Sequence, residues 1–205
     1  MNVNLVDVMG TDLSVVNAAR VSFAKESNEL SDKDEKLIKY LAKHNHWSAF
    51  GHAPLQFRIK APIFVARQLV KHQVGLVWNE VSRRYVDDEP EFFIPDQWRS
   101  RPENSKQGSG EEIIIYNIES TMQFVKQTYQ HLLKANVAPE MARMVLPQNM
   151  YTEWYWSGSL MAFVRVCNLR CKDDTQKETQ HIADCIDWHL HDKFPISWEA
   201  LRDFD

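Results

Sequence analysis

The stretch from Arg67 to Tyr85, RQLVKHQVGLVWNEVSRRY, places the tightest constraint on how this chain folds. Cationic, amide, hydroxyl and carboxylate side chains stand on both sides of an apolar insert, Val74 to Trp78. A solvated loop has no need of Val-Gly-Leu-Val-Trp, and a helix inside a core has no room for so many hydrogen-bonding groups. The pattern is typical of a segment that enters the protein and lines a polar pocket. Guanidinium forks suit phosphates, and Asn, Glu and Ser suit the edges of a polar heterocycle.

A plainer structure is also compatible with this stretch. A helix could carry its basic residues on an outer face and bury a Val-Leu-Trp side, because runs of charge are commonly just solvated. In the pocket-lining alternative, the segment begins at the end of a helix and passes through a loop. The residues alone leave both structures open.

Size and charge limit the classes of function. The chain has 205 residues, enough for one domain with a substantial core or at most two small ones. Its formal net charge is −4, so no overall positive field attracts nucleic acid or an acidic membrane. The N-terminus, MNVNLVDVMG, lacks the sustained apolar core of a signal peptide, and the longest apolar runs are too short to cross a bilayer.

The cysteines indicate a reducing, cytoplasmic setting. Cys167, Cys171 and Cys185 are odd in number and do not suit a disulfide framework. Cys167 and Cys171 share a face if they are helical, but only His181 lies near enough in the sequence to join them. A tetrahedral zinc site needs four ligands, so no zinc site is predicted there.

Three histidines, His44, His46 and His52, raise a metal hypothesis of their own. His-x-His is a genuine ligand spacing, but no Asp or Glu occurs between Glu35 and Glu80 to complete a mixed site. We predict no metal, and keep a histidine-rich metal hydrolase acting on nucleotides as an alternative.

Alternating and short apolar runs predict the strands, at residues 3–8 (VNLVDV), 55–60 (LQFRIK) and 91–95 (EFFIP). Capping residues, prolines and apolar stripes predict the helices. These are a helix capped by Asp12 or Ser14, one after a Ser31–Asp34 capping box with Leu37, Ile38 and Leu41 buried, one from Pro62 through His72, and helices over 111–134, 139–146 and 175–191. Residues 98–110 are predicted to form a flexible loop.

Arg143 and Arg170 stand in apolar surroundings, in ARMVLP and NLR. An unpaired guanidinium is costly there, so each needs an anionic partner. That partner is either a carboxylate of the chain, such as Glu140 for Arg143 or Asp173 for Arg170, or a bound ligand.

The opening stretch resembles the signature of the flavin-dependent thymidylate synthases. That family reads Arg-His-Arg, a spacer and Ser, with Asn-Glu before the Ser and Arg-Tyr after it. Here the triplet is Lys71-His72-Gln73, the spacer to Ser82 is one residue longer, and Asn79-Glu80 and Arg84-Tyr85 are in place. Lys and Gln lack the bidentate forks of the two arginines they replace.

Other segments resemble the same family in the same order. They are Ala-Ala-Arg-Val-Ser at 18–22, His46-x-Ser48-x-Phe50-x-His52 with Gly51 in place of Glu, ARMVLP at 142–147, YTEWYW at 151–156, Arg170, and Thr175-Gln176-Lys177-Glu178. Ser159-Leu160-Met161 replaces a flavin-binding Asn-Ala-Arg, and Arg165 replaces a later Asn. The resemblance covers nearly the whole chain.

The resemblance implies conversion of dUMP to dTMP, with methylenetetrahydrofolate as carbon donor, FAD as hydride carrier and NADPH as reductant. No cysteine here follows a proline, so a cysteine nucleophile for uracil methylation lacks a candidate. No Gly-x-Gly-x-x-Gly occurs either, which argues against a Rossmann dinucleotide fold.

The resemblance also assigns roles to residues. The catalytic residues it implies are Arg170, which stabilises negative charge on the pyrimidine, and His46, which lies against the flavin. The residues it implies for dUMP are Gln68, Glu80, Ser82, Arg83, Arg84, Arg143 and Arg170. Those for FAD are His46, Ser48, Lys71, His72, Gln73, Asn79, Glu80, Ser159, Met161 and Arg165.

The strands, the helices and the resemblance together predict one α+β domain over residues 1–205, with an antiparallel or mixed sheet and long helices packed on it. The family implies a homotetramer with active sites at subunit interfaces. A relative that binds pyrimidine nucleotides without catalysis is the main alternative, because the flavin-binding motif is altered.

Overall fold

The computed structural model describes residues 1–103 and 107–203. Its strands are β1 (Asn2–Val8), β2 (Pro54–Pro62), β3 (Leu76–Glu80), β4 (Trp98–Arg99), β5 (Ile113–Ile114) and β6 (Tyr151–Ser159). Its helices are α1 (Asp12–Arg20), α2 (Asp32–Lys43), α3 (Ser48–Gly51), α4 (Ile63–Leu69), α5 (Glu119–Lys134), α6 (Pro139–Ala142), α7 (Leu160–Arg170), α8 (Lys177–Lys193) and α9 (Pro195–Leu201).

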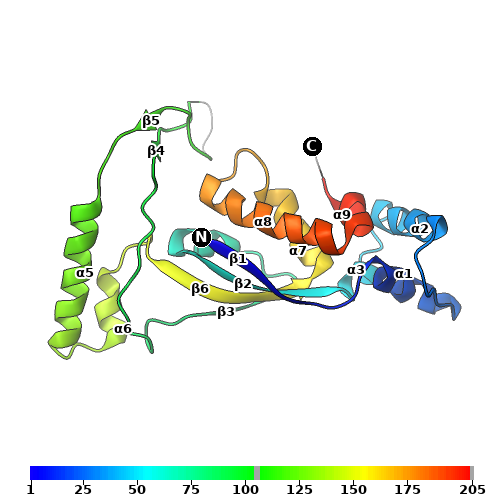
Figure 1. Ribbon diagram of the computed structural model, residues 1–205, viewed down its shortest axis with the longest axis horizontal. Coiled ribbons are helices and arrows are strands. Elements are labelled where there is room, and N and C mark those ends of the chain that lie inside the picture. The colour runs from blue at the N-terminus through cyan, green and yellow to red at the C-terminus, as the bar shows by residue number, and fades with distance from the viewer. Residues whose placement is uncertain (104–106, 204–205) are drawn as a thin grey trace.

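A four-stranded antiparallel sheet in the order β1-β2-β6-β3 organises the molecule. Phe57 pairs with Trp156, which in turn pairs with Trp78, so these side chains share one face. Helices α7 and α8 lie along that side of the sheet (Figure 1). The opposite face carries exposed side chains, including Arg58, Val77 and Tyr155. The α+β prediction is confirmed, and the sheet is antiparallel rather than mixed.

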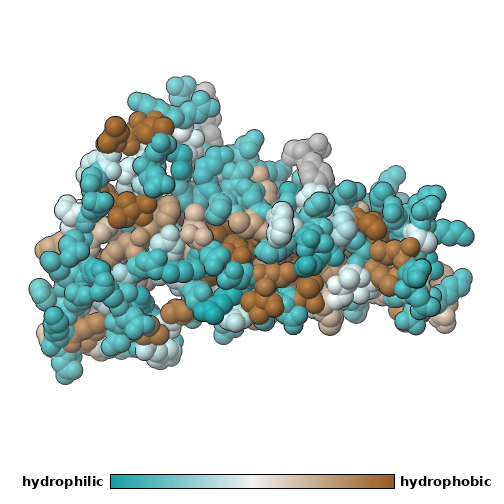
Figure 2. Space-filling view, in the orientation of Figure 1, coloured by the Kyte–Doolittle hydropathy of each residue, from teal (hydrophilic) through white to brown (hydrophobic). Residues whose placement is uncertain are grey.

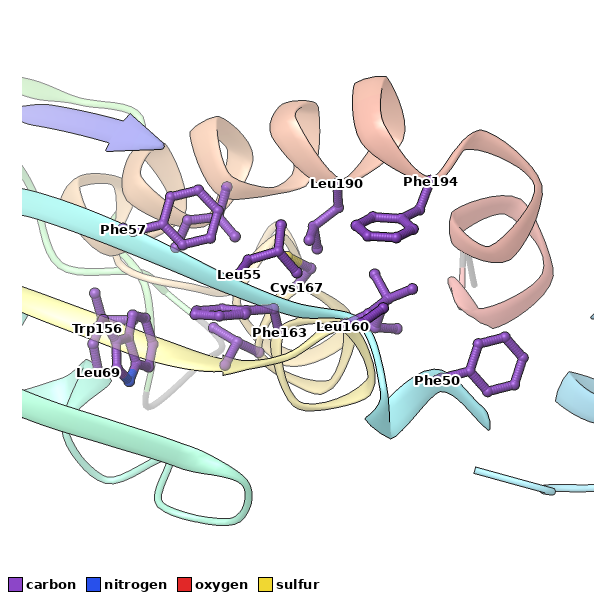
Figure 3. Close-up of a cluster of buried hydrophobic side chains, with 14 of the residues drawn as sticks. Phe50, Leu55, Phe57, Leu69, Trp156, Leu160, Phe163, Cys167, Leu190 and Phe194 are labelled. Atoms are coloured by element: carbon purple, nitrogen blue, oxygen red, sulfur yellow. The ribbon is translucent and has the colours of Figure 1, made fainter. Parts of the chain in front are cut away.

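The core fills the space between the sheet and α7, α8 and α9. Leu55 and Phe57 point from β2 toward Phe163 and Leu190 of the helices, and Phe194 and Phe50 continue the cluster toward α3 (Figure 3). Phe57 and Phe163 meet edge to face, with ring centroids 5.0 Å apart. Burial of these large rings supplies the main hydrophobic stabilisation of the fold.

Two strand predictions are confirmed. Two other predictions are wrong: one segment not expected to be a strand forms one, and one predicted strand does not form. Residues 3–8 lie in β1, and the alternating residues 55–60 lie in β2. Residues 76–80 form β3, whereas we expected either a loop or a helix there. Gly75 adopts a left-handed φ of 76° immediately before β3, which suits a turn into a strand. Residues 91–95 form no strand and contribute only the isolated bridge from Phe92 to Met150.

The first helices largely follow the prediction. The Ser31–Asp34 capping box opens α2, with Ile38 and Leu41 buried as expected and Leu37 only partly buried. The cap of α1 is Thr11, whose hydroxyl accepts a hydrogen bond from the backbone N–H of Leu13. Asp12 instead accepts hydrogen bonds from the backbone N–H groups of Ile196 and Ser197, at 3.0 and 2.9 Å, and so ties α1 to α9. The helix after Pro62 ends at Leu69, short of His72.

The later helices differ more from the prediction. The helix expected from residue 111 begins at Glu119, because Ile113 and Ile114 pair with β4 and the Asn117 side chain accepts a hydrogen bond from the Glu119 N–H at 2.7 Å. Pro139 opens α6 as expected, and a 3-10 turn, Arg143–Val145, follows it. The last predicted helix is α8, and α9 was not expected. The expected flexible loop 98–110 begins with β4, and its residues 104–106 lie outside the described residues.

Residues 86–103 and 107–147, here called the arm, project from one end of the sheet (Figure 1). The arm contains β4, β5, α5 and α6, and the apolar side chains near β5 form an exposed patch (Figure 2). Ile115 is 97% exposed and Tyr116 68% exposed. None of the helices within the described residues is long and apolar enough to cross a membrane.

Candidate active site

A cavity of about 540 Å³ lies between the arm and the sheet and gathers three of the predicted nucleotide residues. Glu80 reaches it from the end of β3, Arg83 from the following turn, and Arg143 from the 3-10 turn after α6. We call this space the arginine cavity. The ends of β2 and β6 complete its wall, with Lys60 and Thr152 among the lining residues.

Glu80 is held in place by two donors on the same face of the sheet. The Thr152 hydroxyl donates to one carboxylate oxygen at 2.7 Å, and the Trp78 indole N–H donates to the other at 3.1 Å. Trp78 itself stacks on Trp154, with centroids 4.4 Å apart. Because successive side chains of a strand point to opposite faces, Asn79 points away from Glu80. The structure therefore separates these two predicted flavin contacts.

Arg143 and Arg83 donate to backbone carbonyls and not to carboxylates. Arg143 Nε donates to the Glu140 carbonyl at 3.2 Å, and Arg83 donates to the Asp88 carbonyl. Across residues 1–103 and 107–203, Arg143 forms no ion pair, so the alternative of a structural pair with Glu140 is wrong. Arg143 is also exposed. Its charge remains available to an anion.

Ser82 and Arg84 lie in the turn that follows β3. The Ser82 hydroxyl accepts from the Arg84 backbone N–H at 3.3 Å, and Ser82 O accepts from Tyr85 N–H at 3.0 Å. The Arg84 guanidinium stands over the Tyr85 ring, 5.0 Å from its centroid. Neither Ser82 nor Arg84 lines the arginine cavity.

Arg170 and His72 meet in a second place, here called the Arg170 cluster. Arg170 ends α7, and its Nε donates to His72 Nε2 at 3.0 Å. Gln68, on α4, donates to the side chain of Gln176 in the connection before α8. Burial lowers the pKa of Arg170, and burial together with the charge of Arg170 lowers the pKa of His72. The expected alternative partner, Asp173, forms no ion pair with Arg170 among the described residues.

Several predicted flavin residues surround the start of α7. Ser159 is its N-cap, and its hydroxyl accepts a hydrogen bond from the Ala162 N–H at 3.2 Å. The loop that carries Lys71 and Gln73 packs there through Gly75, where an added Cβ would meet the Ala162 side chain at 3.2 Å. Lys71 and Gln73 are exposed, and Met161 packs partly into the core.

The remaining predicted flavin residues, His46, Ser48 and Arg165, are exposed. His46 precedes α3, Ser48 begins it, and Arg165 projects from the middle of α7. His46 lies beside His44, with ring centroids 6.5 Å apart. Taken together, the donor set offers cations, amides, hydroxyls and imidazoles, which is the chemistry that a diphosphate and a polar heterocycle require. These residues fit a flavin dinucleotide.

Metal ligands gather elsewhere. Within the described residues, the group that could hold an ion consists of Cys167, Cys171 and Asp187, and His44, His46 and His52 form no such group. The Asp187 carboxylate already pairs with Arg202 at 2.6 Å. The histidine-rich metal hydrolase therefore has no assembled centre in this part of the chain.

Comparison with known proteins identifies the family. The sequence model of the thymidylate synthase complementing proteins matches residues 4–196. The chain belongs to this family. A flavin-dependent thymidylate synthase of Kosmotoga olearia is 40% identical over 98% of the chain and 90% of the relative. One of Thermotoga neapolitana is 41% identical over 97% of the chain and 89% of the relative.

Solved structures of the same kind share the fold. The UMP/dUMP methylase PolB from Streptomyces cacaoi, bound with 5-Br dUMP, superposes with a TM-score of 0.82 at 30% identity, over 97% of this chain and 93% of that one. Bound with 5-Br UMP, it gives a TM-score of 0.80. The resemblance to the flavin-dependent thymidylate synthase family that the motifs indicated is confirmed.

Three residues that contact predicted site residues of this thymidylate synthase-like chain were not among those that its motifs assigned to the site. Trp78 could have been found, because residues two apart on a strand share a face and Trp78 precedes Glu80 by two. Thr152 meets Glu80 only through the pairing of β3 with β6, across 72 positions. Gln176 belongs to the Thr-Gln-x-Glu element, but its contact with Gln68 spans 108 positions and has no local signal.

Proposed function

We propose that this protein is a flavin-dependent thymidylate synthase, an enzyme that methylates dUMP reductively to dTMP. The observation that carries the proposal is the state of Arg170. This guanidinium is half-buried, forms no ion pair among the described residues, and donates to an imidazole nitrogen. A cation kept partly out of water without a carboxylate is arranged for an anionic ligand. The family membership supports the same conclusion.

The nucleotide is held by residues of the arginine cavity, of the Arg170 cluster and of the turn after β3. Arg83, Arg84 and Arg143 supply guanidinium forks for the phosphate, and Ser82 and Gln68 supply hydrogen bonds. Glu80, held by Thr152 and Trp78, accepts hydrogen bonds from the nucleotide. Arg170 lies at the pyrimidine and stabilises the negative charge that develops on it during methylation.

The flavin is FAD, and it supplies hydride chemistry when bound. His46 lies against its ring system, with Ser48, His72, Asn79 and Glu80 as further contacts. Lys71, Gln73, Ser159, Met161 and Arg165 hold the remainder of the cofactor. Methylenetetrahydrofolate is the carbon donor and NADPH the reductant. Lys71 and Gln73 stand where relatives have arginines, so we expect weaker FAD binding than those forks provide.

The assembly is a homotetramer with the active sites at its interfaces, and residues 1–205 act as one domain. Two features support this. The nucleotide residues divide between the arginine cavity and the Arg170 cluster, and the arm exposes Ile115, Tyr116 and Phe124. Apolar patches of this kind mark surfaces that another chain covers. The enzyme works in the cytoplasm, as its three free cysteines suit a reducing compartment, and needs neither nucleic acid nor membrane.

Visible absorption of the purified protein tests the proposal. With FAD added, we expect a flavin spectrum that remains with the protein after gel filtration and that bleaches with NADPH at a rate that dUMP changes. His181→Leu, on the exposed surface of α8, is the matched control. A protein that takes up no flavin at saturating FAD would contradict the catalytic proposal, and dUMP binding by that colourless protein would support the non-catalytic alternative.

A further inference from the structure

The partner of Arg170 is unusual for a guanidinium that is kept partly out of water. His72 lies three residues beyond the end of α4, and Arg170 is the last residue of α7. Their contact spans 98 positions and joins Arg170 Nε to His72 Nε2 at 3.0 Å. Only one of the guanidinium nitrogens takes part in this bond. The two terminal nitrogens, which form the fork of the side chain, do not.

The direction of the hydrogen bond fixes the chemical state of His72. A guanidinium only donates, so His72 Nε2 must be the acceptor and its proton must sit on Nδ1. A protonated imidazole has no lone pair to offer and would repel Arg170. Burial, and to a lesser degree the Arg170 charge, lowers the pKa of His72, which keeps the ring neutral near neutral pH. The charge of Arg170 is the one that acts on His72, and the neighbouring Lys71 is exposed.

A neutral acceptor has a consequence that a carboxylate would not have. A carboxylate would orient the guanidinium strongly but would also cancel much of its field at short range. An imidazole nitrogen orients the group and leaves its full positive charge for the ligand. Stabilisation of developing negative charge depends on donors that are oriented in advance and not neutralised.

We propose that His72 is the positioning residue for Arg170: its Nε2 holds Arg170 Nε and turns the guanidinium fork toward the pyrimidine without neutralising it. The inference rests on the proposed function and deepens it. His72 comes from the segment that we assign to the flavin, so the same side chain links the flavin half of the site to the nucleotide half.

The first test needs neither flavin nor nucleotide. Nuclear magnetic resonance of the ligand-free protein would give the pKa and the tautomer of His72, with the signal assigned from its loss in His72→Gln. We expect an Nδ1–H tautomer and a pKa below the ordinary value of about 6.5. In Arg170→Met the pKa of His72 should rise, because the positive charge beside the imidazole is removed. An Nε2–H tautomer, or a pKa that Arg170→Met leaves unchanged, would overturn the inference.

The second test measures dUMP affinity calorimetrically in the FAD-saturated protein. His72→Gln keeps an acceptor that does not titrate, whereas His72→Leu removes the acceptor. We expect about 3- to 10-fold weaker binding for His72→Leu, the size of one neutral hydrogen bond, and substantial rescue by His72→Gln. His181→Leu is the control on an exposed histidine and should bind as the wild type does. Equal losses for Leu and Gln would overturn the positioning role.

The pH dependence separates positioning from a purely structural role. As pH falls through the pKa of His72, wild-type affinity should fall further than that of His72→Gln, because only wild type loses its acceptor. Both proteins share the titration of the dUMP phosphate, so their difference isolates His72. If the magnetic resonance measurement shows the contact between His72 and Arg170 but no dTMP forms, the proposed function fails. If dTMP forms while His72→Leu behaves like His181→Leu, this inference fails.

Discussion

The sheet with its helices differs from the arm in how many apolar side chains it buries. The buried cluster draws its residues from β2, β6, α7, α8 and neighbouring elements, and includes none of the described residues of the arm. In the arm, the sixteen-residue helix α5 buries a single side chain, Tyr129, and packs on α6 and the 3-10 turn. The sheet half therefore contains the buried core, while the arm leaves apolar side chains such as Ile115 and Phe124 exposed.

The residues of the candidate site also divide between the sheet half and the arm. The Arg170 cluster comes from the end of α7 and the loop after α4, and both helices bury side chains in the core, among them Leu69 and Val166. The arginine cavity depends on Arg143, which the arm carries. The comparison shows that core elements position the Arg170 cluster, whereas the arginine cavity takes Arg143 from the less anchored region.

Trp156→Ala should give the largest change in stability. Trp156 is 0% exposed and meets Phe163 edge to face, so its removal leaves a cavity and should lower the free energy of unfolding by about 3–5 kcal/mol. Urea denaturation would measure this. A loss below about 1 kcal/mol would break the claim that the sheet half supplies the stability of the chain.

Arg170→Ala should give the largest loss of activity. Removal of one preorganised donor typically costs about 10²- to 10³-fold in kcat. Steady-state dTMP formation would measure it. The control is His181→Leu, on the exposed surface of α8. An unchanged kcat in Arg170→Ala would show that Arg170 does not take part in the chemical step.

Arg143→Ala should weaken dUMP binding while leaving kcat at saturating dUMP close to the wild-type value. A charge-assisted hydrogen bond contributes about 1.5–3 kcal/mol, which corresponds to about a 10- to 100-fold rise in Kd. Titration calorimetry would measure the affinity, and thermal unfolding should be unchanged because Arg143 is exposed. A fall in kcat as large as that of Arg170→Ala would erase the distinction between the two regions.

Phe124→Ala should weaken the assembly more than the fold. Phe124 is 69% exposed on α5, so its truncation creates no cavity within the chain. If another chain covers this ring, the dissociation constant of the assembly should rise by about 10-fold or more, as expected for about 1.5–3 kcal/mol of burial. Sedimentation velocity over a range of concentrations would measure it. An unchanged assembly would place the interface elsewhere.

The smallest expected effect is the pH dependence of stability. The pKa of His72 is lowered in the folded protein, so the unfolded chain binds more protons between the folded value and about 6.5. Stability should therefore fall as pH drops through this window. His72→Gln should show a smaller fall between about pH 7.5 and pH 5.5 in urea titrations. Identical slopes would mean that His72 is not held neutral by its surroundings.

Local patterns predicted the parts of the fold that local chemistry decides. The alternation in residues 55–60 and the Ser31–Asp34 capping box gave correct elements because period and cap are read within a few residues. The start of α5 was misplaced because Ile114 continues the apolar stripe of the helix, although Ile113 and Ile114 pair with β4. Asn117 could have corrected it, since Asn is favoured just before a helix.

The candidate site was predicted residue by residue, but not its arrangement. The motifs named Glu80, Arg143 and Arg170, and the structure brings Glu80 and Arg143 to one cavity. The contact of His72 with Arg170 spans 98 positions, and no local pattern encodes it. Contacts of that range follow from the packing of both α4 and α7 on the sheet, which single-sequence periodicity does not determine.

The most direct test is the fate of a labelled carbon. The protein is incubated with dUMP, NADPH, FAD and methylenetetrahydrofolate carrying ¹³C in its methylene group, and the nucleotides are analysed by mass spectrometry. We predict dTMP one mass unit heavier than unlabelled dTMP, formed only when FAD and NADPH are both present, and formed about 10²- to 10³-fold more slowly by Arg170→Ala. Unchanged dUMP in a protein that has taken up FAD and binds the nucleotide would contradict the account.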